Sequence, residues 1–157
     1  MKTISFTRHA DYSCEKEPKD IYDSERPKAS LIGKNMKPKP EIIYTSEALR
    51  AITTSECIAE GAGGVEIKQD KLLGEFSVKP GIDLFFERLF PALKEGNIET
   101  IAIVSHRPTL DKMLSFKLPC LGTCMIQRET WEEIEEILAD IYNTQHRQHI
   151  KIIDLLK

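Results

Sequence analysis

The sequence predicts a single α/β domain in which helices cover both faces of a mostly parallel β-sheet. Two observations lead to this prediction. Apolar runs of strand length alternate with longer segments whose apolar residues recur at helical spacing, a pattern typical of chains that build a parallel sheet. The chain of 157 residues can bury one core, and no internal repeat or low-complexity tract divides it. Residues 1–157 are therefore expected to form one domain.

The first elements follow from the apolar runs near the N-terminus. Residues 2–7 form an apolar run that predicts a buried strand, and a polar connection rich in Lys, Glu and Pro follows it to about residue 27. A short helix is predicted at 28–34, where Gly33 and the prolines that follow would end it. Residues 41–44 are predicted to form the second strand.

The middle of the chain alternates helix and strand. Ser46 can act as the N-cap of a helix that runs to Glu60, and a glycine-rich segment then stops that helix. A short strand is expected at 65–67. Residues 82–94 have leucine and phenylalanine at helical spacing before a terminating glycine, and the apolar run 100–104 predicts the next strand.

The C-terminal part is less regular. A helix is expected to start at Pro108, because proline suits the first helical turn. Residues 122–128 are predicted as an edge strand, and 130–142 as a helix that opens with a capping box ending at Glu133. The apolar stretch 150–156 fits either a strand or a last helical turn, and its periodicity does not separate the two.

Charge and hydropathy exclude several classes of function. The net charge is −3 with both signs mixed along the chain, which argues against a nucleic-acid-binding protein that relies on a basic face. The sequence shows no charged leader followed by an apolar run, and no apolar stretch of membrane-spanning length. A cytoplasmic protein with no membrane or nucleic-acid partner is expected. The sequence leaves the oligomeric state open.

No metal or cofactor site is predicted. The 4 cysteines are scattered, and the close pair Cys120 and Cys124 has no partner pair that would complete a zinc site, so reduced thiols are expected. His146 and His149 lie one helical turn apart, but no further ligand stands at convincing spacing. A polar, solvent-facing segment is the expected reading of that pair.

Two strands run directly into a histidine that has an arginine as its neighbour. Arg8-His9 follows the first strand and His106-Arg107 follows the strand at 100–104, while Arg50 comes just after the strand at 41–44. In an open α/β sheet, ligands bind where strands end and helices begin, so these groups are expected to converge. Two imidazoles among guanidinium groups make a pocket for a dianion that also contains a nucleophile. This pattern favours phosphoryl transfer through a phosphohistidine.

These three segments resemble the histidine phosphatase superfamily, which has the phosphoglycerate mutase-like fold. Arg8-His9-Ala10 is similar to the Arg-His-Gly/Ala signature after the first strand, and Arg50 fits the Ser-x-x-x-Arg-Ala segment. The stretch from Ser105 to Leu110 is similar to the second histidine motif. The resemblance spans about residues 1–116 and is closest to the short SixA-type phosphohistidine phosphatases. It implies a three-layer sandwich with a mostly parallel central sheet.

The resemblance also implies roles for the matched residues. His9 would be the nucleophile, Arg8 and Arg50 would clamp the phosphate, and His106 would donate a hydrogen bond to a phosphoryl oxygen. No cofactor is implied. Arg107 departs from the pattern, since related sequences more often have Asn or a small residue there. It is expected either to add a cation to the pocket rim or to point to solvent.

The proton donor is less well marked. Many members of the superfamily place a Glu or Asp between the arginine segment and the second histidine, and Glu75 is the best candidate because Gly74 suggests a loop there. Asp70 and Asp83 are the fallbacks, and a solvated surface carboxylate is the alternative reading of Glu75. SixA-type enzymes resemble this chain partly because they manage without a dedicated acid.

The substrate class depends on how open the site is. The interval from Arg50 to His106 is short and leaves little material for a lid, so an open site that accepts a phosphorylated protein side chain, phosphohistidine above all, is favoured. Residues 11–27 would form its variable wall. Two alternatives stay open: a small-metabolite phosphatase or mutase that uses Glu75 as its acid, and a phosphate-binding module without useful turnover.

Overall fold

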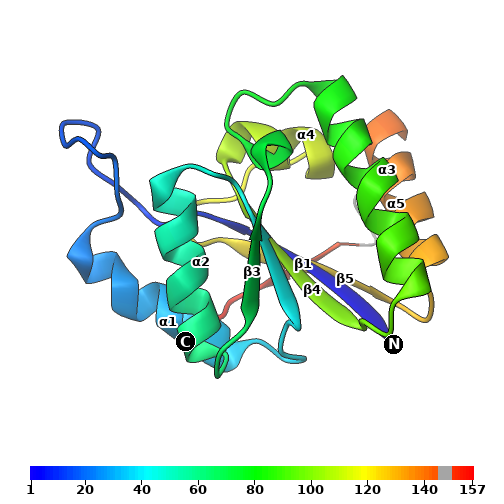
Figure 1. Cartoon of the computed structure of the whole chain (residues 1–157), viewed down its shortest axis with the longest axis horizontal. Helices are drawn as coiled ribbons and strands as arrows, with labels where there is room; N and C mark the ends of the chain where they lie inside the picture. The colour runs from blue at the N-terminus through cyan, green and yellow to red at the C-terminus, as the bar shows by residue number, and fades with distance from the viewer. Residues whose placement is uncertain (145–149) are drawn as a thin grey trace.

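A six-stranded sheet forms the centre of the molecule, in the strand order β3-β2-β4-β1-β5-β6 (Figure 1). The computed structural model describes residues 1–144 and 150–157. The strands are β1 (Lys2–Arg8), β2 (Ile42–Thr45), β3 (Glu66–Gln69), β4 (Thr100–Ser105), β5 (Thr123–Arg128) and β6 (Lys151–Ile153). The helices are α1 (Arg26–Asn35), α2 (Leu49–Gly61), α3 (Lys79–Glu95), α4 (Arg107–Leu114) and α5 (Trp131–Thr144), with short 3-10 helices η1 (Asp23–Glu25) and η2 (Lys71–Leu73).

The sheet is parallel on one side and antiparallel on the other. Strands β3, β2, β4 and β1 pair in parallel, so their carboxyl ends lie at one edge. Strand β5 pairs antiparallel with β1, and β6 pairs antiparallel with β5. The expectation of an edge strand at 122–128 is wrong, because β6 lies outside β5. The same finding resolves the ambiguous stretch 150–156, whose residues Lys151–Ile153 form a strand.

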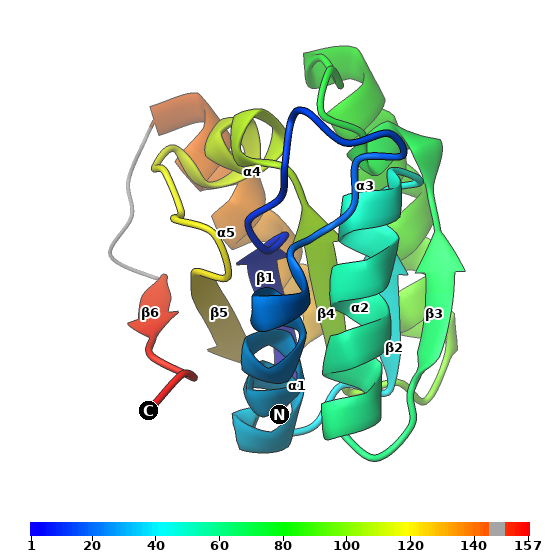
Figure 2. The same cartoon turned by 90° about the vertical axis from the view of Figure 1, so that its left-hand side faces the viewer.

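Helices cover both faces of the sheet, as the alternating pattern predicts. Helices α1 and α2 pack together on one face, and Figure 2 shows them side by side in front of the strands. Helices α3, α4 and α5 lie on the other face. The α/β class with a sheet flanked by helices is therefore confirmed.

Two separate apolar cores follow from the alternation of side chains along the strands. Successive side chains point to opposite faces of a sheet. Ile101 and Ile103 of β4 accordingly join the core under α3, α4 and α5, whereas Ala102 and Val104 join the core under α1 and α2. All four side chains are fully buried. Strand β4 thus lies at the centre of the fold and fixes the position of the residue that follows it.

Several helix boundaries differ from the predicted ones. Helix α3 begins at Lys79 rather than residue 82, since Pro80 stands in its first turn, where a missing N–H costs nothing. Helix α2 begins after Ala48, not after Ser46. Gly33 does not end α1, which continues through it to Asn35. The capping box of α5 is confirmed: the Thr130 Oγ1 accepts the Glu133 N–H at 3.2 Å, and the Glu133 carboxylate accepts the Thr130 N–H at 3.0 Å.

Two further observations concern the part of the chain that the structure describes. No helix there is long and apolar enough to span a membrane. No group of three or more His, Cys, Asp or Glu side chains is arranged there to hold a metal ion. The segment with His146 and His149 lies outside the described residues.

Candidate active site

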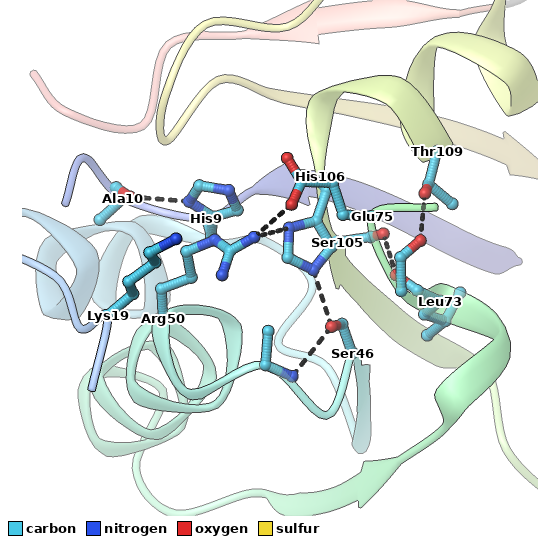
Figure 3. Close-up of polar contacts among 12 residues, drawn as sticks. His9, Ala10, Lys19, Ser46, Arg50, Leu73, Glu75, Ser105, His106 and Thr109 are labelled. Atoms are coloured by element: carbon cyan, nitrogen blue, oxygen red, sulfur yellow. Dashed lines mark hydrogen bonds and ion pairs between the residues drawn. The ribbon is translucent and has the colours of Figure 1, made fainter. Parts of the chain in front are cut away.

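The two histidines of the motifs meet at the carboxyl ends of neighbouring strands. Strands β1 and β4 pair in parallel with Arg8 opposite Ser105, so His9 and His106 each take the next step past the sheet. The His9 N–H donates to the Ser105 carbonyl at 3.1 Å. The ring centroids lie 5.0 Å apart, and both side chains are buried (Figure 3). Two segments almost a hundred residues apart therefore build one imidazole pair.

The hydrogen bond made by His9 fixes its tautomer. Its Nδ1 lies 2.8 Å from the Ala10 carbonyl oxygen, which can only accept, so Nδ1 bears the proton and Nε2 keeps a free lone pair. Burial lowers the pKa of His9 to about 4, the Ala10 carbonyl opposes that shift, and the Arg50 and Arg8 charges add to it. His9 is consequently a neutral imidazole at pH 7 with one nitrogen available for attack.

His106 has the opposite tautomer. The Arg50 guanidinium donates to its Nδ1 at 3.3 Å, so its Nε2 bears the proton and donates to the Ser46 Oγ at 2.7 Å. The Ser46 Oγ also accepts the Ala48 N–H at 3.1 Å. Burial lowers the pKa of His106 to about 3, helped by nearby His9 and by the Arg50 and Arg8 charges. Ser46, expected to cap a helix, instead orients this histidine. Because Nε2–H donates to Ser46 and Nδ1 accepts from Arg50, His106 has no free N–H for a phosphoryl oxygen, which differs from the donor role that the resemblance implies.

Arg50 connects the remaining groups of the site. It stands in the first turn of α2, directly after β2, and β2 is the neighbour of β4 in the sheet. Its guanidinium pairs with the Glu75 carboxylate at 2.7 Å and lies over the Tyr12 ring, 4.7 Å from the centroid. The same ring packs edge-on against His9 at 5.4 Å. Tyr12 therefore contacts both the candidate nucleophile and a candidate phosphate clamp.

Arg8 is the last residue of β1 and directly precedes His9. Its Nη1 donates to the Leu118 carbonyl at 3.2 Å. Its Nε is buried without a hydrogen-bond partner among the described residues, and the same holds for the Nε of Arg50. A buried donor without an acceptor is costly, and a guanidinium fork suits the oxygens of a phosphate. Both arginines thus retain unused donor capacity close to His9.

Glu75 lies at the site, and the fallback acids do not. Its loop is anchored from two sides: the Ser105 hydroxyl donates to the Leu73 carbonyl at 2.6 Å, and the Thr109 hydroxyl donates to the Gly74 carbonyl at 2.5 Å. Asp70 caps η2 and pairs with Arg88 at 3.0 Å. Asp83 pairs with Lys79 at 2.9 Å along the exposed side of α3.

Arg107 opens α4 and is exposed. It is not among the residues that line the cavity beside His106. Of the two positions expected from the sequence, the structure favours the solvent-facing one.

A cavity of about 390 Å³ opens next to His106, Arg50 and Glu75, and its wall does not include His9 or Arg8. Its wall includes Tyr12, Lys19, Lys71 and Phe76, which the motifs do not indicate. Tyr12 and Lys19 belong to the connection after β1, whose mixed polar sequence gives no local signal for such a role. That connection does form a wall of the site, as expected for residues 11–27.

Comparisons with known proteins identify the fold through similar solved structures. Neither a protein-family model nor the sequence of a curated protein matches the chain. Solved structures superpose on it well. They include the protein histidine phosphatase SixA complexed with tungstate (15% identity, 80% of this chain and 87% of that chain, TM-score 0.64). The ecdysone phosphate phosphatase from Bombyx mori, also with tungstate, has 14% identity over 82% of this chain and 90% of that chain, with a TM-score of 0.65.

The alpha-ribazole phosphatase from Shigella flexneri has 12% identity over 82% of this chain and 92% of that chain, with a TM-score of 0.65. Together with the order of the sheet and the two flanking layers, these likenesses establish the fold. The chain has the phosphoglycerate mutase-like fold of SixA and other histidine phosphatases.

Proposed function

We propose that the protein is a phosphatase that works through a phosphohistidine intermediate on His9. The observation that supports this most directly is the state of His9: neutral, held by the Ala10 carbonyl, and with Nε2 unprotonated. The charges of Arg50 and Arg8 both act on it, and the Nε of each arginine is buried without a hydrogen-bond partner among the described residues. A neutral imidazole attacks phosphorus and later leaves, which divides one difficult displacement into two easier steps.

The two steps use the same groups. In the first, the Nε2 lone pair of His9 attacks phosphorus, the bond from phosphorus to the leaving group breaks, and the leaving group departs with the bonding electrons. In the second, water attacks the phosphohistidine, and the phosphorus–nitrogen bond breaks to return neutral His9 and inorganic phosphate. Arg8 and Arg50 would stabilise charge on the equatorial oxygens, and the His106 ring, whose two nitrogens bond to Arg50 and Ser46, would hold the Arg50 guanidinium in place for the phosphoryl group.

The favoured substrate is a phosphohistidine residue of a protein. Glu75 lies 2.7 Å from Arg50 as an ion pair, so it is not free to act as an acid until that pair parts. A phosphorus–nitrogen bond needs less help from an acid than an alkyl phosphate, whose alkoxide must be protonated. The alternative within enzymes is a small-ester phosphatase or mutase in which the bound phosphate displaces the Glu75 carboxylate from Arg50, and Glu75 then takes a proton from solvent and gives it to the leaving alkoxide. Figure 3 shows the Glu75 carboxylate pointing at the Arg50 guanidinium.

Turnover of an aryl phosphate in the presence of EDTA tests the proposal. We expect metal-independent hydrolysis that His9→Ala abolishes while its thermal unfolding stays cooperative. Phosphate binding without turnover in the wild-type protein would instead identify a non-catalytic phosphate-binding module. The values of kcat/KM for a phosphohistidine peptide and for an alkyl phosphate then distinguish a phosphohistidine phosphatase from a small-ester phosphatase or mutase.

A further inference from the structure

Two lysines line the cavity but have no role in the phosphoryl transfer proposed above. Lys19 comes from the connection after β1, and Lys71 is the first residue of η2, so two separate segments of the fold bring positive charge to one cavity. Figure 3 shows the Lys19 side chain extending from its loop toward Arg50 and His9. Their charges are additional to those of Arg8 and Arg50.

The nearby carboxylates do not hold the two lysines in strong ion pairs. Lys19 lies 3.8 Å from Glu17, with side chains that are 45% and 76% exposed, and exposed pairs of this kind contribute little. Glu75, on the cavity wall, already pairs with Arg50. Glu47 is the other carboxylate of the wall and is exposed to solvent. The ammonium groups of both lysines can therefore bind an anion that enters the cavity.

The cavity also has room for more than a phosphoryl group. Its volume of about 390 Å³ falls in the range of sites that hold a whole small ligand, roughly 300–1,000 Å³. Phe76 forms an apolar part of its wall and is 88% exposed, and Val78 in the same loop is 60% exposed. Apolar side chains held this far out in solvent beside a site suit contact with a polypeptide surface.

We propose that Lys19 and Lys71 bind an acidic side chain next to the phosphorylated residue of a polypeptide substrate. The inference rests on the proposed function and narrows its substrate class to phosphohistidine with an Asp or Glu neighbour. The lysines act as specificity-determining residues and not on the reacting atoms.

Two phosphohistidine peptides test the proposal, identical except that acidic residues flank the phosphohistidine in one and the matching amides flank it in the other. At low ionic strength we expect the wild-type protein to prefer the acidic peptide about tenfold in kcat/KM, with each of Lys19→Gln and Lys71→Gln lowering that ratio about threefold, the size expected of an exposed charge pair. Added salt should reduce the wild-type ratio. Lys16→Gln is the matched control, since Lys16 is an exposed lysine of the same connection outside the cavity wall.

The outcomes separate the inference from the function on which it depends. Equal rates on the two peptides, or a ratio that falls as much in Lys16→Gln as in Lys19→Gln and Lys71→Gln, overturn the lysine site and leave the phosphatase proposal intact. If the protein hydrolyses neither of the two peptides nor the aryl phosphate, both the lysine site and the phosphatase proposal are overturned. A preference for the acidic peptide that depends on Lys19 and Lys71 but not on Lys16 supports the site.

Discussion

The two histidines of the site are chemically different because each has a different hydrogen-bond partner. The Ala10 carbonyl accepts from Nδ1 of His9 and leaves Nε2 as a lone pair. The Arg50 guanidinium donates to Nδ1 of His106 and leaves Nε2 as a donor to Ser46. One ring therefore keeps a nitrogen with a free lone pair, and the other has both nitrogens in hydrogen bonds.

At the level of one residue, the variant Glu75→Gln distinguishes a phosphohistidine phosphatase from a small-ester phosphatase or mutase. If Glu75 protonates the leaving group, hydrolysis of an alkyl phosphate should fall about 10²-fold, the usual size of general-acid catalysis, while a phosphoramidate loses little. Loss of the carboxylate also frees Arg50, so inorganic phosphate should bind the variant more tightly than the wild type. Steady-state kinetics on both substrates and phosphate inhibition constants measure the two effects. Equal losses on both substrates would mean that Glu75 supports the loop instead.

Ser46→Ala tests the orientation of His106. Without the Ser46 Oγ, the His106 Nε2–H loses its acceptor, while the Arg50 guanidinium still donates to Nδ1 and keeps the proton on Nε2. We expect kcat to fall about tenfold, a loss of about 1.4 kcal/mol of transition-state stabilisation, and the ¹⁵N resonance of His106 Nε2 to shift because its hydrogen bond is lost. Ser5→Ala, a buried serine of β1 away from the site, is the control. Unchanged ¹⁵N shifts in Ser46→Ala would contradict the positioning role.

At the level of elements, two helices approach each other through a pair of glycines. A Cβ on Gly33 of α1 would lie 1.9 Å from the Ile58 carbonyl oxygen, and a Cβ on Gly61 of α2 would lie 1.8 Å from the Ser30 carbonyl oxygen. The backbones of α1 and α2 are thus in direct contact. Helix α2 begins with Arg50 in its first turn, so this contact helps to set where the guanidinium stands.

Gly33→Ala should separate the two helices. The added methyl group meets backbone rather than a flexible side chain, so we expect a loss of about 1–3 kcal/mol in the free energy of unfolding, the usual size of overpacking. Gly81→Ala in α3 is the control, because its Cβ would lie 3.5 Å from the Leu72 Cδ2, an ordinary contact, and alanine favours the helix. Urea denaturation of both variants measures the difference. Equal unfolding free energies of Gly33→Ala and Gly81→Ala would show that the backbones of α1 and α2 are not in close contact at Gly33.

The same glycines show which parts of the fold the sequence could predict. Alternating apolar runs were enough to predict the parallel sheet and its helical layers, because burial on two faces dictates that pattern. A glycine that ends a helix and a glycine that lets another backbone approach look alike in sequence, which is why the expected helix end at Gly33 is wrong. The expectation that 122–128 is an edge strand is wrong because of β6, a strand of 3 residues that is too short to give a recognisable pattern in the sequence.

For the site, the sequence could predict the groups at strand ends. His9, His106 and Arg50 converge because parallel strands end at one edge of a sheet. The contacts of Tyr12 and Lys19 depend on how the connection after β1 folds back over the site, and no periodic pattern encodes that path. The Arg50–Glu75 pair joins two segments through loop geometry, which is also outside the reach of a motif.

At the level of the whole molecule, burying two neutral histidines makes the stability depend on pH. Both have pKa values far below the ordinary value of 6.5, about 4 for His9 and about 3 for His106. Between pH 6.5 and about 4, the unfolded chain therefore binds protons at these positions that the folded chain does not. Stability contributed in this way is present above pH 6.5 and is lost as the pH falls through that window.

Replacing His9 should make the fold less sensitive to acid. Between pH 7 and 5, His9→Gln should lose about 2 kcal/mol less of its unfolding free energy than the wild type, since glutamine does not titrate. Urea titrations at the two pH values measure the difference, and the carboxylates shared by both proteins cancel. Parallel losses in the two proteins would show that His9 titrates near its ordinary pKa in the fold.

If His9 becomes phosphorylated during turnover, rapid quenching with a ³²P-labelled substrate should trap the phosphoenzyme. We expect a phosphoenzyme that survives alkali and decays in acid, with the label on a peptide containing His9 and absent from His9→Ala. Label on an Asp, Ser or Cys residue, or label that persists in His9→Ala, would show that His9 is not the nucleophile.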